Sequence, residues 1–148
     1  MVAQRYGRGA GFSLIEVIAV LLLTVVLAVV AVPRLMDSGV AVAAEAEVLR
    51  AHLRFAQSLA VSANTAGWSV LVAGQSYQLQ RNGAASPIHF PGESSATHVL
   101  AGGVNVTGGA GALVFDALGA PAATHVITLS DGTRTETVSV TGFTGLIP

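Results

Sequence analysis

Residues 12–32 read FSLIEVIAVLLLTVVLAVVAV, and this run decides how the rest of the chain is interpreted. All of its residues are apolar except Ser13, Glu16 and Thr24. As a helix the run would extend about 31 Å, which is close to the hydrocarbon thickness of a bilayer. The sequence therefore predicts that residues 12–32 form a membrane-spanning helix.

Charges on either side of the run indicate its orientation. Arg5 and Arg8 precede it, and acidic residues follow it from Asp37 onward. Because basic residues remain on the cytoplasmic side of a span, we expect the N-terminus in the cytoplasm and the C-terminal domain outside it. Two other interpretations stay open: a plain membrane anchor, and a secretory signal peptide, for which residues 28–32 offer small side chains near a cleavage site.

Glu16 is the first candidate functional residue. A carboxylate at the centre of a bilayer costs on the order of 2.5–3.5 kcal/mol on insertion scales. A positive partner in a medium of low dielectric constant would stabilise that charge much more than water does. The sequence therefore indicates that Glu16 has a specific partner or lies at a shallow depth.

Residues 11–16, Gly-Phe-Ser-Leu-Ile-Glu, resemble the processing signature of type IV pilins and type II secretion pseudopilins. In that family a short basic leader is removed after the glycine, the new N-terminal Phe is N-methylated, and a Glu stands at the fifth mature position. The resemblance implies that residues 1–11 are a leader and that prepilin peptidase cleaves between Gly11 and Phe12. It also implies N-methylation of Phe12, whose amino group would pair with Glu16 of a neighbouring subunit during assembly.

The same helix is expected to continue after the apolar run. Pro33 removes one backbone hydrogen bond and is expected to kink the helix. Apolar residues then recur at spacings of three and four along residues 38–62, which predicts an amphipathic helix lying on a sheet. Its expected apolar stripe consists of Leu49, Leu53, Ala56, Ala60 and Ala63. The charged residues Glu45, Arg50 and Arg54 are expected largely off this stripe.

From residue 67 onward the hydrophobic period is two, which predicts strands. The expected strands cover residues 68–73, 76–80, 98–101, 104–107, 113–116, 125–130 and 133–141. Gly74-Gln75 is expected to join the first two strands as a hairpin. Asp131-Gly132 favours a two-residue type I′ turn between the last two strands, and residues 84–96 are expected to form a loop. The layout predicts an α+β fold similar to that of pilins, with a long N-terminal membrane-spanning helix packed on an antiparallel β-sheet.

The expected domains are a cleaved leader (1–11), a transmembrane part of the helix (12–32), its amphipathic continuation (33–64) and an antiparallel β domain (65–148). A weaker likeness, to the GspH/FimT group of minor subunits or to a minor pilin of the mannose-sensitive haemagglutinin type, extends over the amphipathic part of the helix and the strands. These resemblances imply a non-enzymatic subunit that assembles into, initiates or caps a periplasmic fibre of a type II secretion or type IV pilus system.

The same resemblance implies partners and a location. The partners are other pilin or pseudopilin subunits, prepilin peptidase and the inner-membrane assembly platform. The location is the bacterial inner membrane, where the protein would be single-pass with its N-terminus cytoplasmic and its C-terminal domain periplasmic, and then a periplasmic or extracellular fibre. It remains open whether the fibre serves secretion, pilus function, DNA uptake or adhesion.

Composition and motifs favour no other chemistry. A pilus-associated binding module for DNA or a secreted substrate is the second interpretation, but beyond the helix only Arg81 and Arg134 could contact phosphates. The chain has no cysteine, and its histidines lack ligand spacing: His52, His89, His98 and His125. We therefore expect no metal and no cofactor. No nucleophile elbow or phosphate loop occurs, so no catalytic residue is predicted.

Overall fold

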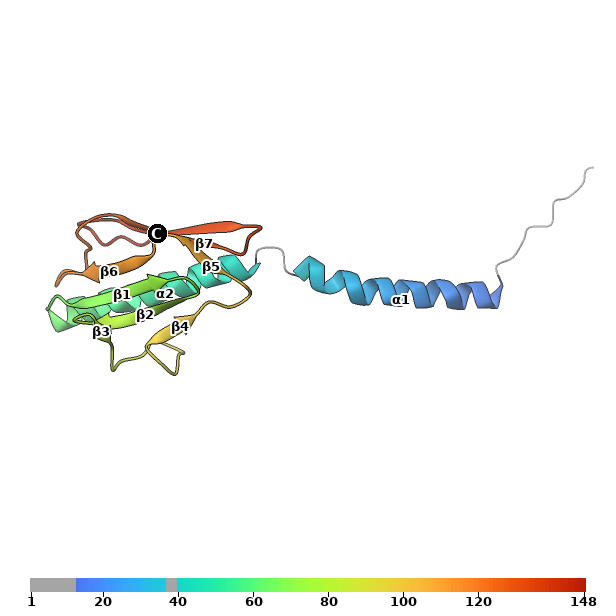
Figure 1. The fold of residues 1–148 in the computed structure, drawn as a ribbon, viewed down its shortest axis with the longest axis horizontal. Helices are drawn as coiled ribbons and strands as arrows, with labels where there is room; N and C mark the ends of the chain where they lie inside the picture. Colours follow the sequence, from blue (N-terminus) through green and yellow to red (C-terminus); the bar gives the residue numbers. More distant parts are fainter. Residues whose placement is uncertain (1–12, 37–39) are drawn as a thin grey trace, which may run out of the picture. The chain divides into compact units, whose positions relative to one another are not determined.

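The computed structural model describes residues 13–36 and 40–148. The chain divides into two compact units, with the boundary between residues 38 and 39, and each unit is described by itself (Figure 1). The first unit contains helix α1, Leu14–Met36. The second contains helix α2, Val40–Ala63, followed by strands β1 to β8.

Helix α1 corrects the prediction of a membrane span. Among the residues that the structure describes, no helix is both long and apolar enough to cross a bilayer. The membrane-spanning helix over residues 12–32 and the single-pass location in the inner membrane are therefore wrong.

The pilin-like fold class is corrected in the same way, because two helices are observed where one long helix was expected. Helix α1 continues past Pro33 to Met36, and α2 begins at Val40. Whether the helix bends at Pro33 stays a prediction. The structure is α+β with two antiparallel sheets.

Helix α2 is amphipathic, as its sequence predicts. Its fully buried apolar residues are Val42, Ala46, Leu49, Leu53, Ala56 and Ala60. They recur at intervals of three and four, so they form one stripe along the helix. Ala63, which was expected at the end of this stripe, is exposed because it is the last residue of the helix.

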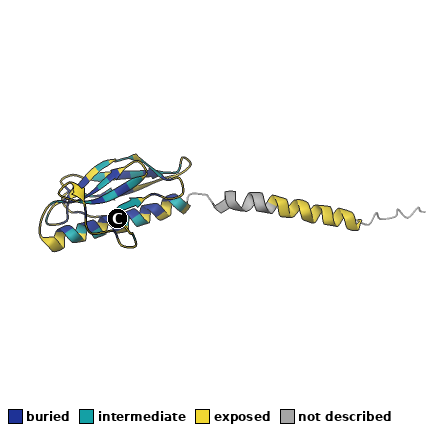
Figure 2. Ribbon diagram, turned by 60° about the horizontal axis from the view of Figure 1, so that its bottom comes forward, coloured by how far each residue is buried: buried dark blue, intermediate teal, exposed yellow. Residues whose placement is uncertain are grey.

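The strands form two antiparallel sheets. The first has the order β3-β2-β1-β6, with β4 paired to β2; its strands are β1 Trp68–Ala73, β2 Ser76–Arg81, β3 Ala84–Ala85, β4 Thr97–Val99 and β6 Gly111–Phe115. The second has the order β5-β7-β8; its strands are β5 Asn105–Gly108, β7 His125–Ser130 and β8 Thr135–Val140. Figure 2 shows buried residues along α2 and the strands, whereas the side chains described in α1 are exposed.

The two predicted hairpins have different outcomes. Strands β1 and β2 pair from Trp68↔Arg81 to Ala73↔Ser76, so the tight turn at Gly74-Gln75 is confirmed. Strands β7 and β8 pair only up to Ser130↔Thr135, so their loop has four residues instead of the predicted two. The Asp131 carboxylate accepts the N–H groups of Thr133 and Arg134 at 2.8 and 2.7 Å. These local bonds replace strand pairing at the start of the expected second strand.

The first prediction concerns the stripe of α2. Replacing Leu53, which is 0% exposed, with Ala should lower the free energy of unfolding by about 2–5 kcal/mol, because it leaves a cavity between the helix and the sheets. The measurement is denaturant-induced unfolding followed by fluorescence of Trp68, the single tryptophan. Leu118→Ala is the matched control, since Leu118 is 83% exposed. Equal effects of the two substitutions would contradict the packing described here.

Candidate functional sites

Helix α1 begins with a polar cap. The Ser13 hydroxyl oxygen accepts the Glu16 N–H at 3.4 Å, and the Ser13 carbonyl accepts the N–H groups of Glu16 and Val17 at 3.0 and 3.2 Å. A Ser followed three residues later by a Glu is the capping-box pattern, and an acid in the first turn meets the positive end of the helix dipole. Glu16 therefore stabilises the N-terminus of α1. The interpretation of the sequence missed this role.

The other residues of the processing motif are not placed by the structure. Gly11 and Phe12, at the predicted cleavage and methylation site, lie outside the described residues. The Glu16 side chain is exposed. Cleavage after Gly11, methylation of Phe12 and the pairing of its amino group with Glu16 of a neighbour therefore stay predictions.

Helix α1 presents apolar side chains on all its sides. Leu21, Leu22 and Leu23 occupy three successive positions and are 61%, 62% and 63% exposed. Successive residues of a helix point about 100° apart, so these three leucines alone face three directions. A helix that is apolar all round is normally buried against other apolar groups. The described surface of α1 therefore has the chemistry of a segment that becomes covered.

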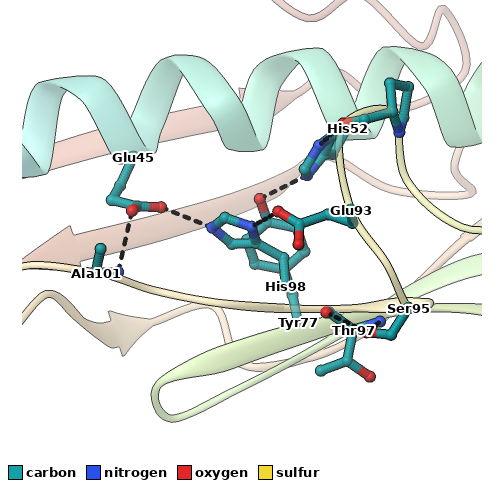
Figure 3. A network of polar contacts seen from close by, with 9 residues as sticks. Glu45, His52, Tyr77, Glu93, Ser95, Thr97, His98 and Ala101 are labelled. Carbon is teal, nitrogen blue, oxygen red and sulfur yellow. Dashed lines mark hydrogen bonds and ion pairs between the residues drawn. The ribbon is translucent and has the colours of Figure 1, made fainter.

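A second site lies in the folded unit. The residues Glu45, His52, Tyr77, Glu93 and His98 form a connected group that we name the acid–histidine cluster (Figure 3). Glu45 and His52 belong to α2, Tyr77 to β2 and His98 to β4, while Glu93 lies in the connection between β3 and β4. The cluster therefore joins the helix, the first sheet and a long loop.

His98 is held between two carboxylates. Its Nε2 lies 2.9 Å from Oε2 of Glu45, and its Nδ1 lies 2.6 Å from Oε1 of Glu93. The second carboxylate oxygen of Glu45 accepts the backbone N–H of Ala101 at 3.0 Å. Because an ionised carboxylate can only accept hydrogen bonds, both ring nitrogens of His98 donate when the ring is protonated. In its protonated form His98 is therefore an imidazolium that bridges two acids.

His52 has the opposite protonation state. Its Nε2 donates to the Pro91 carbonyl at 3.3 Å, and its Nδ1 lies 2.8 Å from the Tyr77 hydroxyl. Since the carbonyl can only accept, Nε2 carries the proton and Nδ1 accepts the hydrogen bond of Tyr77 in the neutral ring. The ring also stacks on Phe90 with a centroid separation of 4.3 Å. His52 and Tyr77 thus form a buried neutral pair beside the charged His98.

The pKa values follow from these surroundings. Burial lowers the pKa of His98, but its hydrogen bonds to Glu93 and Glu45 and the charges of those acids outweigh burial and raise it above the ordinary 6.5. Burial lowers the pKa of His52 below 6.5, and the nearby His98 lowers it further, against a hydrogen bond to the Pro91 carbonyl that raises it. Burial, followed by the charges of Glu45 and Glu93, raises the pKa of Tyr77 far above its usual value.

The two remaining histidines do not join the cluster. His89 is exposed, and Nε2 of the half-buried His125 lies 2.9 Å from the Gly109 carbonyl oxygen. Within the described ranges, no group of three or more His, Cys, Asp or Glu side chains has an arrangement that could hold a metal ion. The cluster can hold and release a proton, and its members bond to one another instead of converging on an open position.

Searches with protein-family models, among characterised proteins and among solved structures found no match to this chain. The family resemblance therefore stands on the residues of the N-terminal motif and on the weaker likeness along the chain. What it implies for function is a proposal.

The sequence contained one signal of the cluster that its interpretation missed. Glu45 was expected off the apolar stripe of α2, yet it is only 8% exposed. It lies three residues after Val42 and four before Leu49, and His52 follows at the next interval of three. Polar side chains at core-facing positions require buried partners. That rule indicates a polar site, although it does not identify His98 or Glu93 as the partners.

The second prediction concerns the neutral pair. Tyr77→Phe removes the hydroxyl that donates to His52 and leaves the Nδ1 of a ring that is 4% exposed without its partner. The free energy of unfolding should fall by about 1–3 kcal/mol. Denaturant unfolding measures the change, and the double variant with His52→Leu provides the control. If Tyr77→Phe costs as much in the His52→Leu background as in the natural chain, the two groups are not coupled.

Proposed function

We propose that this chain is a minor pilin or pseudopilin subunit that joins a fibre through helix α1. The observation that carries the proposal is the described surface of α1, which is apolar on every side and contains one acid, Glu16, in the first turn. Such a helix is suited to packing among other apolar helices. The resemblance of residues 11–16 to the pilin processing signature supports the same function.

The proposed assembly step is the formation of an ion pair between subunits. Prepilin peptidase cleaves the bond between Gly11 and Phe12, which gives Phe12 a free α-amino group that is then methylated. When α1 packs among helices of neighbouring subunits, the amino group of one chain meets the Glu16 carboxylate of another. Packed apolar side chains exclude water there, so the attraction between the charges is stronger than in solvent.

The proposed partners are other pilin or pseudopilin subunits, the peptidase and an assembly platform. The folded unit would be displayed by the fibre, where the subunit initiates or caps it, and the chain itself performs no catalytic step in this proposal. Type II secretion and type IV pilus systems are both compatible with the residues that carry the proposal.

The alternative function, binding of DNA or of a secreted substrate, receives less support from the arginines of the folded unit. Arg50 pairs with Glu47 at 2.7 Å and donates to the Thr137 carbonyl, and Arg54 donates to the Ile147 carbonyl. Arg81 lies 5.2 Å over the ring of Trp68. Phosphate contacts depend on clustered basic groups that are free to reach the nucleic-acid backbone. Three of the four arginines of the folded unit, all except Arg134, have these protein partners.

The third prediction tests the charge of Glu16. Glu16→Gln keeps the capping-box pattern, in which Gln replaces Glu well, but removes the negative charge. Cleavage after Gly11 should proceed normally, whereas incorporation into fibres should fall about thirtyfold or more, since loss of one partner of a desolvated charge pair costs about 2–5 kcal/mol. Quantification of the subunit in sheared or sedimented fibres measures incorporation.

Glu47→Gln is the matched control for this experiment, because Glu47 is an exposed acid on the folded unit. It should assemble like the natural chain. Normal incorporation of Glu16→Gln would refute the ion pair as the basis of assembly.

The fourth prediction concerns the mature N-terminus. Mass spectrometry of the assembled protein should find a chain that begins at Phe12 and carries one methyl group on its amino nitrogen. A chain that retains Met1, or one that begins after residue 28, would refute the assignment to this family of subunits.

A further inference from the structure

The cluster fixes one segment of the folded unit to α2. We name residues 91–101, from Pro91 to Ala101, the strap; it includes β4. Three hydrogen-bond contacts join it to the helix: His52 to the Pro91 carbonyl, His98 to Glu45, and the Ala101 N–H to Glu45. Two of the three therefore depend on the Glu45 carboxylate, which is buried between α2 and the strap (Figure 3).

We propose that His98 makes the strap a proton-operated latch, closed on α2 while the ring carries both of its protons and released from Glu45 when it loses one. The geometry gives the reason, since carboxylate oxygens lie 2.9 and 2.6 Å from the two ring nitrogens. A neutral ring has one N–H, so one nitrogen would present its lone pair to a carboxylate. Two acceptors at that distance repel each other.

Loss of the His98 proton has a large effect because His98 and Glu45 are buried. The side chains of His98 and Glu45 are only 12% and 10% exposed, while that of Glu93 is 30% exposed. Without the imidazolium, Glu45 retains its bond from Ala101 but has lost its counter-ion in a site with little water. Separation of the strap from α2 rehydrates the carboxylate, which is the favourable response of a buried unpaired charge.

The other titratable groups around His98 do not replace it. On α2, His52 is neutral and bonded to Tyr77 and Pro91; on β2, Tyr77 keeps its proton. Glu93 is the acid on the strap itself. Because the pKa of His98 is raised, its contribution to stability is complete below 6.5 and is lost as the pH rises through the raised value. His52, with its lowered pKa, reduces stability only when the pH falls below 6.5, so the two effects have opposite signs.

The latch does not depend on how α1 assembles. The fifth prediction tests the latch by NMR of the full chain in a solubilising detergent. The His98 ring should titrate above pH 6.5. Across that titration, the hydrogen-exchange protection factor of the Ala101 amide should fall at least tenfold. The amide of Val106, which donates to the Gly74 carbonyl outside the strap, should keep its protection and is the internal control.

Variants separate the latch from a general effect of pH. His98→Gln should show low protection of Ala101 at every pH, whereas His125→Gln should retain the pH-dependent change. Glu93→Gln, at the more exposed acid, should lower the titration midpoint of His98 and shift the loss of protection with it. The proposal is overturned if protection of Ala101 is constant through the His98 titration, if His98 titrates below 6.5, or if His98→Gln keeps the pH dependence.

Discussion

Helix α2 is the constraint on which the folded unit depends, because both sheets bury apolar residues against it. It contacts β1 and β6 of the first sheet and β7 and β8 of the second. The sheets have no strand in common within the part of the chain that the structure describes. A backbone hydrogen bond from Val106 to the Gly74 carbonyl, at 2.8 Å, links β5 to the β1–β2 turn. The apolar stripe of α2 is therefore what makes one core out of two sheets.

Polar side chains of the same helix fix the end of the chain. The Gln57 amide donates to the carbonyls of Gly119 and Gly145 at 2.7 and 2.9 Å. Gly145 has a φ of 66°, and a Cβ there would lie 2.4 Å from both the Gln57 amide nitrogen and the Gly119 carbonyl oxygen. Only glycine fits this approach. The closing segment then inserts Ile147, 6% exposed, into the core. The hydrogen bonds of Gln57 thus hold the closing segment in the place where Ile147 can pack into the core.

How much the sequence reveals depends on whether a feature is local. The stripe from Leu49 to Ala60 and the β1–β2 hairpin follow from spacing and turn residues, so both were predicted. The β7–β8 loop was not, because the Asp131 side chain competes with strand pairing for backbone N–H groups. The cluster could not be assembled from sequence, since His98 and Glu45 are 53 residues apart and only the β4–β2 pairing brings His98 to the helix.

One physical rule applies to Glu45 in the folded unit and to Glu16 in α1, which both stand among apolar residues. A carboxylate that is removed from water needs hydrogen-bond donors or a positive partner. In the folded unit, Glu45 meets its requirement for donors within the chain, from Ala101 and His98. In α1, Glu16 is exposed, and its backbone takes part in the cap with Ser13. Water therefore solvates that carboxylate while α1 stands alone.

That situation changes once other helices cover α1. The carboxylate of Glu16 then loses its water, and covering the helix becomes unfavourable unless a positive group arrives with the neighbour. The amino group freed at Phe12 in the proposed processing step is such a group, and it exists only on a cleaved chain. In the proposed function the acid would therefore oppose packing of uncleaved subunits and favour packing of mature ones, so that one carboxylate both permits assembly and makes it conditional on processing.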